Sequence, residues 1–327
     1  MGIIRRMSPE ELFGEAERLE EDGDTAAALQ VWRGLVQIHP DPVSLCRLAS
    51  LAEELGEIDE AEHAFRQAIQ SDPGFGAAYS GLASIAMDRG DYNDAESLLN
   101  HALQIEQDEG TCCLLGVTLK HLGKIEEARE CYLNALRINP VFDEAYYNLG
   151  VLVRHSNPAE AEALYCKALE CTPGYAEAHR ELGWQLVKRG SLVEAEQHLC
   201  RAIALQPDDT WAHIYLANLL WRRGDIDRAI VEYEWARESA PESAVPLWAL
   251  ASLYENQEDW AKAQPLYERA LALEPDDATG NKNFGRMLKK KGDLAGAKDY
   301  LSRALFLDPN YVEAKDLLLD LQQPPMP

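Results

Sequence analysis

Histidine and cysteine are the residue types in this 327-residue sequence that could bind a metal, with eight and seven copies. His121 and His155 are 34 residues apart, as are His179 and His213, so each pair could hold equivalent positions in neighbouring structural units. A protein zinc site needs about four ligands, and neither pair has a carboxylate or thiol at a suitable spacing. We therefore expect no metal site and no cofactor.

Catalytic motifs are missing as well. The sequence contains no G-x-S-x-G, G-x-G-x-x-G, Walker A, H-E-x-x-H or EF-hand pattern. The cysteine count is odd, Cys112 and Cys113 are adjacent, and no Cys-x-x-Cys occurs. Such usage indicates reduced thiols in a cytoplasm rather than a disulfide framework. We expect a non-catalytic, cytoplasmic protein.

The charge balance is strongly acidic, because 31 Lys and Arg face 56 Asp and Glu, a formal charge of −25. Nucleic acids and anionic membranes attract Lys- and Arg-rich surfaces, so neither is an expected partner. The longest uncharged stretch, residues 73–87, has 15 residues, whereas a spanning helix needs ~20. The composition favours a protein partner with a basic segment.

An alanine recurs every 33 or 34 residues along almost the whole chain. Seven residues after each of these alanines stands a second alanine, except at Leu35, and five residues further on a proline, except at Gln107. A fixed period of this length is typical of repeat proteins. The first alanines of the units are Ala28, Ala61, Ala95, Ala128, Ala161, Ala195, Ala229, Ala263 and Ala297.

Each unit has the pattern of two helices. In the sixth unit Gly190 ends the first helix, and Leu199 stands between the two small residues Ala195 and Ala202 of the second. Small residues allow two helices to approach closely, and the proline that follows ends the second helix. One such pair cannot bury its apolar face alone, so the units must stack.

The fifth unit shows a family signature. Leu149-Gly150, Ala161, Tyr165, Ala168 and Pro173 resemble the tetratricopeptide repeat (TPR) in residue type and order, although the signature Trp at the fourth position is absent. The resemblance implies an all-α fold, a right-handed α-solenoid (superhelix) of stacked antiparallel helix pairs. It covers residues 9–309 as nine repeats, at 9–41, 42–75, 76–108, 109–142, 143–175, 176–209, 210–243, 244–277 and 278–311.

The two ends differ from the repeats. We expect a lead-in over residues 1–8, in which Ser8 and Glu11 form a capping box. After the last repeat we expect a capping helix over 312–321 and a disordered tail over 322–327.

The resemblance also implies a concave groove, lined by the first helices of successive repeats, that binds a peptide. Its residues run from acidic in repeats one to three, including Glu17, Glu20 and Glu53, through aromatic to basic in repeat nine. A bound segment is therefore expected to place its basic end on repeats one to three. The predicted groove residues are Tyr147, Asn148, Arg180, Trp184, Trp211, Ile214, Tyr215, Asn218, Trp221, Trp248, Lys282 and Arg286.

The seventh repeat supports a binding surface most clearly. Leu216, Ala217 and Leu220 already provide the apolar stripe that an amphipathic helix buries. A second stripe, from Trp211 to Trp221, is rich in residue types that are common at interfaces. The simpler alternative is that these aromatic residues fill gaps between repeats.

We therefore predict a non-catalytic scaffold that binds a peptide or protein segment in its groove. One alternative is a self-assembling scaffold that forms homo-oligomers through its convex face or its ends. Another is a regulatory subunit of an enzyme complex.

Overall fold

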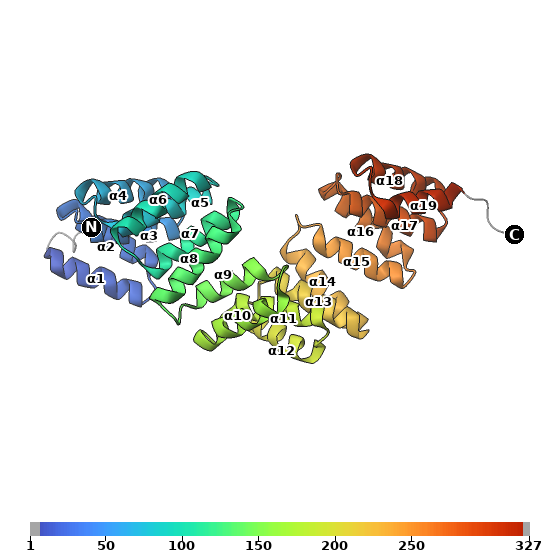
Figure 1. Cartoon of the computed structure of the whole chain (residues 1–327), viewed down its shortest axis with the longest axis horizontal. Coiled ribbons are helices and arrows are strands. Elements are labelled where there is room, and N and C mark those ends of the chain that lie inside the picture. Colours follow the sequence, from blue (N-terminus) through green and yellow to red (C-terminus); the bar gives the residue numbers. More distant parts are fainter. Residues whose placement is uncertain (1–6, 323–327) are drawn as a thin grey trace. The chain divides into compact units, whose positions relative to one another are not determined.

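The computed structural model describes residues 7–322, and within that range it contains helices and no strand (Figure 1). The chain divides into two compact units, Met1–Pro173 and Gly174–Pro327. The predicted all-α fold is confirmed.

Unit 1 contains ten helices. Each odd-numbered helix packs against the even-numbered helix that follows, and successive pairs stack on one another. The helices are α1 (Pro9–Glu21), α2 (Thr25–Ile38), α3 (Pro42–Glu54), α4 (Ile58–Ser71), α5 (Gly76–Asp88), α6 (Tyr92–Ile105), α7 (Glu109–His121), α8 (Ile125–Ile138), α9 (Asp143–Val153) and α10 (Pro158–Cys171).

Unit 2 follows the same plan with nine helices. Four pairs stack in order, and the last helix packs on the fourth pair without a partner of its own in the described part of the chain. The helices are α11 (Ala176–Arg189), α12 (Leu192–Leu205), α13 (Thr210–Arg223), α14 (Ile226–Ser239), α15 (Val245–Asn256), α16 (Trp260–Leu273), α17 (Ala278–Lys291), α18 (Leu294–Leu307) and α19 (Val312–Gln322).

The first helix begins as predicted. The Ser8 hydroxyl accepts a hydrogen bond from the Glu11 amide at 3.2 Å, and the Glu11 carboxylate accepts one from the Ser8 amide at 2.8 Å. Two amides that the helix itself cannot satisfy are thus paired. The remaining lead-in, residues 1–6, lies outside the described part of the chain, as do residues 323–327 of the predicted tail, while Gln322 belongs to α19.

The second helices end just before the prolines. Asp72, which precedes Pro73, has extended backbone angles, because a proline disfavours the helical conformation in the residue before it. In the unit without proline, the Gln107 side chain donates a hydrogen bond to the Leu103 carbonyl at 2.8 Å instead. The Gln107 side chain thus gives a backbone carbonyl in the last turn of this helix a hydrogen-bond donor.

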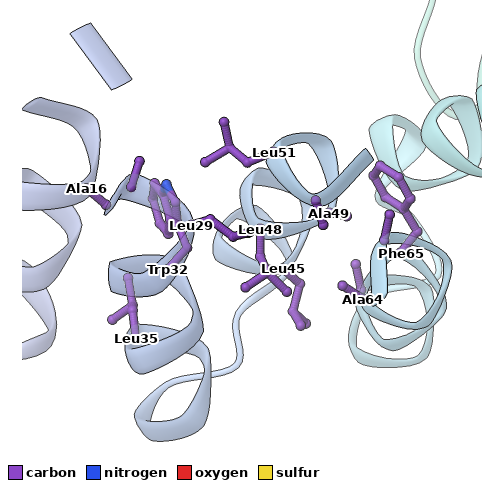
Figure 2. Packing of buried hydrophobic residues seen from close by; sticks show 14 of the residues in the cluster. Ala16, Leu29, Trp32, Leu35, Leu45, Leu48, Ala49, Leu51, Ala64 and Phe65 are labelled. Atoms are coloured by element: carbon purple, nitrogen blue, oxygen red, sulfur yellow. The ribbon is translucent and has the colours of Figure 1, made fainter. Parts of the chain in front are cut away.

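Buried side chains between neighbouring pairs form the core. Trp32 is fully buried in α2, with Phe13 of α1 packed edge-on at 5.0 Å, and Figure 2 shows it beside Leu45 and Leu48 of α3.

At some contacts between paired helices, the two helices approach so closely that one of them needs a residue without a side chain. A Cβ on Gly150 in α9 would lie 2.6 Å from the Tyr165 ring in α10, so only glycine fits there.

Two turns between paired helices, at residues 154–157 and 257–259, differ from the others. Helix α9 has only 11 residues, and Asn157 caps α10 by accepting a hydrogen bond from the Glu160 amide at 3.3 Å. In the other turn Glu258 has a φ of 58°, where equivalent turns have glycine. Glu258 therefore holds a backbone conformation that costs energy in any residue other than glycine.

Candidate functional site

Helices α11 and α13 lie side by side in unit 2 and run in the same direction. Arg180 pairs with Asp209 at 2.8 Å, Trp184 stacks on Tyr215, and Arg222 donates a hydrogen bond to the carbonyl of Val187. Residue numbers rise in the same order on both helices from one contact to the next, as they do in parallel helices. Asp209 also caps α13 by accepting hydrogen bonds from the amides of Trp211 and Ala212. These contacts fix how the two helices present their side chains.

Three aromatic rings and one lysine gather on these helices, and we call them the aromatic cluster: Trp184, Lys188, Trp211 and Tyr215. The Trp184 and Tyr215 rings are stacked, with centroids 4.5 Å apart and planes 8° apart. The Trp211 ring lies 5.8 Å from Tyr215, and the Lys188 ammonium lies 5.2 Å from the Trp184 centroid. Trp211 is 48 % exposed. The structure thus brings together three of the predicted site residues.

The packing stripe of α13 is separate from this cluster. Leu216, Ala217 and Leu220 are buried, as the sequence analysis expected of them. Ile214 is also buried, at 4 % exposure, so it packs rather than lines a surface. Asn218 is half-buried. Its side-chain nitrogen donates a hydrogen bond to the Ile214 carbonyl at 2.8 Å, and its side-chain oxygen accepts one from the Tyr233 hydroxyl at 3.0 Å.

The other two predicted groove tryptophans, Trp221 and Trp248, lie outside the aromatic cluster. Trp221 is half-buried near the end of α13. Trp248 of α15 packs against the core, with its ring 5.8 Å from Tyr267 and directly over Gly280 of α17. A Cβ on Gly280 would come within 2.5 Å of that ring. Trp248 therefore contributes to packing between α15 and α17.

The predicted basic end of the groove is neutralised within unit 2. Lys282 is 7 % exposed, and its ammonium pairs with Glu313 at 2.8 Å. Arg286 pairs with Glu255 through two hydrogen bonds of 3.2 Å, and Lys289 pairs with Asp320. These ion pairs reduce the positive charge that α17 can offer to a ligand.

Glu255 is a buried carboxylate that the sequence analysis did not identify. Besides Arg286, it accepts hydrogen bonds from Lys290 at 2.9 Å and from the Tyr267 hydroxyl at 2.7 Å. Burial alone would raise the pKa of the Glu255 carboxyl, but these hydrogen bonds outweigh it and the pKa is lowered. Glu255 thereby links α15, α16 and α17.

The predicted groove residues of unit 1 make contacts of their own. The Tyr147 ring lies 6.0 Å from Tyr165, and the Asn148 amide lies 3.4 Å from the Cys113 sulfur. Glu20 accepts a 2.6 Å hydrogen bond from the indole of Trp32, so it is partly structural.

The histidines contact partners other than those the spacing suggested. His179 lies beside His198, with the two Nδ1 atoms 2.9 Å apart, and His213 lies 2.6 Å from Glu232. Burial and the neighbouring His179 lower the pKa of His198. Within residues 7–322, no three histidine, cysteine or acidic side chains are grouped as a metal site would need.

Two cavities lie in unit 1, away from the aromatic cluster. One of about 530 Å³ lies between α2 and α4 near Arg33 and Glu60, and one of about 440 Å³ lies beside Phe13 and Val43. Glu10, an acidic residue on the inner surface expected for repeat one, lines the second cavity, and neither cavity is lined by a residue of the aromatic cluster.

Two cations were not predicted from the sequence: Lys188, which belongs to the aromatic cluster, and Arg222, which lies beside it. Lys188 and Arg222 are 34 residues apart, and each is the first residue of a dibasic pair in the last turn of its helix. That shared register was the signal that could have identified them.

Comparisons with known proteins agree with this architecture. Residues 9–245 match the family model described as the cilia and flagella-associated protein 70 C-terminal domain, and residues 248–312 match a tetratricopeptide repeat model. Tetratricopeptide repeat protein 6 of Homo sapiens is 25 % identical over 165 residues, which is 49 % of this chain and 32 % of that protein. The chain thus aligns with about a third of that relative's length.

Solved structures share the fold at low sequence identity. The Cut9–Hcn1 hetero-tetramer of APC/C matches over 97 % of this chain and 90 % of its own, with a TM-score of 0.61 and 14 % identity. A tetratricopeptide repeat protein of Parabacteroides merdae covers 76 % of this chain and 99 % of its own, with a TM-score of 0.59 and 20 % identity. Pseudomonas aeruginosa pilF covers 65 % and 97 %, with a TM-score of 0.57 and 20 % identity.

Proposed function

The chain belongs to the tetratricopeptide repeat family, and on this premise we propose that it is a scaffold that binds a peptide segment of another protein through the aromatic cluster. The observation that carries the proposal is the 48 % exposure of Trp211 in a helix whose packing stripe is complete without it. An aromatic ring of this kind can bury ~150–250 Å² and offer its N–H to a ligand carbonyl. Repeat proteins of this kind bind ligands along extended surfaces.

The members of the cluster have different roles in this proposal. Trp184 is covered by Tyr215 and approached by Lys188, so it holds the other rings in place. Trp211 has the larger accessible area and is the anchor. Tyr215 contacts both tryptophans and connects them.

A basic segment in the partner is the second part of the proposal. Residues 1–173 carry 13 Lys and Arg against 31 Asp and Glu, a formal charge of −18. On the predicted groove positions of unit 1, Glu17, Glu54 and Asp88 are exposed. Opposite charge on the ligand would speed association, with an effect that falls as salt rises.

The test is a selection of random dodecapeptides displayed on phage against the full-length chain, followed by affinity measurements on the selected peptides. We expect Trp211→Ala to weaken binding about 30-fold, the equivalent of a ~2 kcal/mol anchor, with the helical circular dichroism signal unchanged. Phe306→Ala is the matched control, because Phe306 is 81 % exposed in α18 and lies outside the cluster. Equal binding by the wild-type and Trp211→Ala chains would refute the proposal.

Self-association is a second candidate, favoured by apolar side chains near the last helix. Phe306, Val312 and Leu319 are 81 %, 67 % and 48 % exposed. Sedimentation velocity at several protein concentrations tests this candidate. A constant monomer mass excludes it, and a mass that rises with concentration and falls in Phe306→Ser supports it.

We also propose a cytoplasmic location. The cysteines are free thiols, and burial raises the pKa of Cys113 to about 12, which keeps it protonated and unreactive. Within the described residues, no helix is long and apolar enough to span a bilayer. Fluorescence imaging of the tagged chain tests the location, and the description of the matching family model makes cilia the second place to look.

A further inference from the structure

Each of the helices α11 and α13 ends in two adjacent cations, and the two cations of a pair have different partners. Arg189 pairs with Glu194 at 3.6 Å, and Arg223 pairs with Glu196, so the second cation of each pair meets a carboxylate of α12. Arg222 instead donates a 2.8 Å hydrogen bond to the Val187 carbonyl of α11. Lys188 lies over the ring of Trp184.

The Arg222 charge is not neutralised within the part of the chain that the structure describes. No Asp or Glu among residues 7–322 lies within 4 Å of its guanidinium, and the residue is exposed. A guanidinium has five N–H donors in a planar fork, and one bond to a carbonyl leaves others for a ligand. The hydrogen bond to the Val187 carbonyl holds the Arg222 guanidinium against α11, which is the helix that carries Trp184.

Helix-end electrostatics explain only part of this arrangement. Cations are favourable in the last turn of any helix, so both pairs could serve the helix dipole alone. The last turn of α17 is a comparison: Lys289 and Lys290 there meet the carboxylates of Asp320 and Glu255, whereas Lys291 donates a hydrogen bond to the side-chain oxygen of Gln264. Arg222 likewise has a neutral partner, and unlike Lys291 it lies on the helix that carries Trp211 and Tyr215.

The net charge of the chain does not prevent an acidic ligand from binding at this position. Residues 174–327 carry 18 Lys and Arg against 25 Asp and Glu, a formal −7 compared with −18 in unit 1. Charges more than ~8 Å away are largely screened at physiological salt. The distant acidic residues of unit 1 therefore contribute little at the end of α13.

We infer that Arg222 reads an Asp or Glu side chain of the bound peptide, next to the residue that contacts the aromatic cluster. This inference rests on the proposed function and adds the chemistry of the ligand. Arg222 lies seven residues beyond Tyr215 on the same helix, which is ~10 Å along its axis. An extended peptide covers that distance in about three residues, so the acidic side chain should stand within about three positions of the apolar one.

The experiment uses the same random dodecapeptide library on four full-length chains: wild type, Arg222→Gln, Arg223→Gln and Trp211→Ala. Arg223→Gln is the matched control, since it removes an equal charge one residue away from a cation that already has Glu196 as partner. We expect wild type and Arg223→Gln to select peptides with an acidic residue within three positions of an aromatic residue or proline. Arg222→Gln should bind these peptides at least about tenfold more weakly, as loss of a charged hydrogen bond implies.

Failure of the inference and failure of the proposed function give different results. Selected peptides that depend on Trp211 but lack an acidic residue overturn the inference and leave the proposed function standing. Equal losses in Arg222→Gln and Arg223→Gln also overturn it, because the effect is then one of overall charge. If no peptide binds wild type more tightly than Trp211→Ala, the proposed function fails and the inference falls with it.

Discussion

A buried tyrosine hydroxyl has a different environment in two of the repeats. Tyr132 of α8 has a hydroxyl with no hydrogen-bond partner among the described residues, whereas the Tyr233 hydroxyl of α14 donates to Asn218 at 3.0 Å. Both rings are fully buried. A buried hydroxyl without a partner pays a desolvation cost that a paired one recovers.

We therefore predict opposite effects of the same substitution at these two positions. Tyr132→Phe should raise the free energy of unfolding by about 1 kcal/mol, because it removes an unpaired polar group. Tyr233→Phe should lower it by about 1 kcal/mol and leaves Asn218 without that partner. Urea denaturation followed by circular dichroism measures both. The account is wrong if the two substitutions destabilise the chain equally.

Glu255 gives a pH-dependent contribution to stability. Its pKa is lowered from the ordinary value of 4.5, so the folded state favours the charged carboxylate. The stabilisation is complete above pH 4.5 and is lost as the pH falls through the lower folded value.

Replacing this carboxylate should destabilise unit 2. We expect Glu255→Gln to cost about 2 kcal/mol at pH 7, less than the ~3–5 kcal/mol of a fully buried pair, because Arg286 and Lys290 are partly exposed and can be solvated. The difference from wild type should shrink as the pH is lowered below 4.5. Glu194→Gln, in the ion pair with Arg189 that is exposed on both sides, is the control and should have a much smaller effect. A pH-independent difference would contradict the assigned charge.

At the scale of the helix, the turn between α15 and α16 is strained. Glu258 has a φ of 58°, while Gly190, Gly224 and Gly292 occupy the left-handed region in the other turns of unit 2. We expect Glu258→Gly to stabilise the chain by about 0.5–1 kcal/mol, because relief of strain exceeds the added entropy of the unfolded chain. Thermal unfolding measures this effect. Gly224→Ala should shift the melting temperature in the opposite direction, and a drop with Glu258→Gly would be evidence against strain.

Helix ends were predictable from the sequence because their causes are local. The capping box at Ser8 and the helix stop before Pro73 depend on residues at most three positions away. Contacts between helices were predicted less well. The pairing of Arg286 with Glu255 joins residues 31 positions apart, and the burial of Ile214 depends on how far α13 is rotated against its neighbours. Residue type and repeat position do not determine either quantity.

The aromatic cluster shows the same division. That Trp184, Trp211 and Tyr215 lie on adjacent first helices follows from the repeat period. That Tyr215 covers one face of Trp184 while Trp211 stays 48 % exposed depends on side-chain rotamers. The choice of Trp211 as the anchor therefore required the structure.

At the scale of the whole molecule, we expect the stacked fold to need neither a metal ion nor a disulfide. The cysteines are free, and the described residues contain no cluster suited to a metal ion. We predict that thermal unfolding curves with and without a chelator, and with and without a reductant, coincide. A drop of several degrees with either reagent would identify a cross-link or ion that this account omits.

The short reach of the contacts between repeats has a consequence for synthesis of the chain. The hydrogen bonds from Asn148 to Cys113, Arg222 to Val187 and Lys290 to Glu255 each join residues 35 positions apart. A ribosome adds ~5–20 residues per second, so a newly made helix pair waits about 2–7 seconds for the next first helix to cover it. Each repeat can therefore fold while the chain is still being translated, and the surface exposed to aggregation at any moment is that of one repeat.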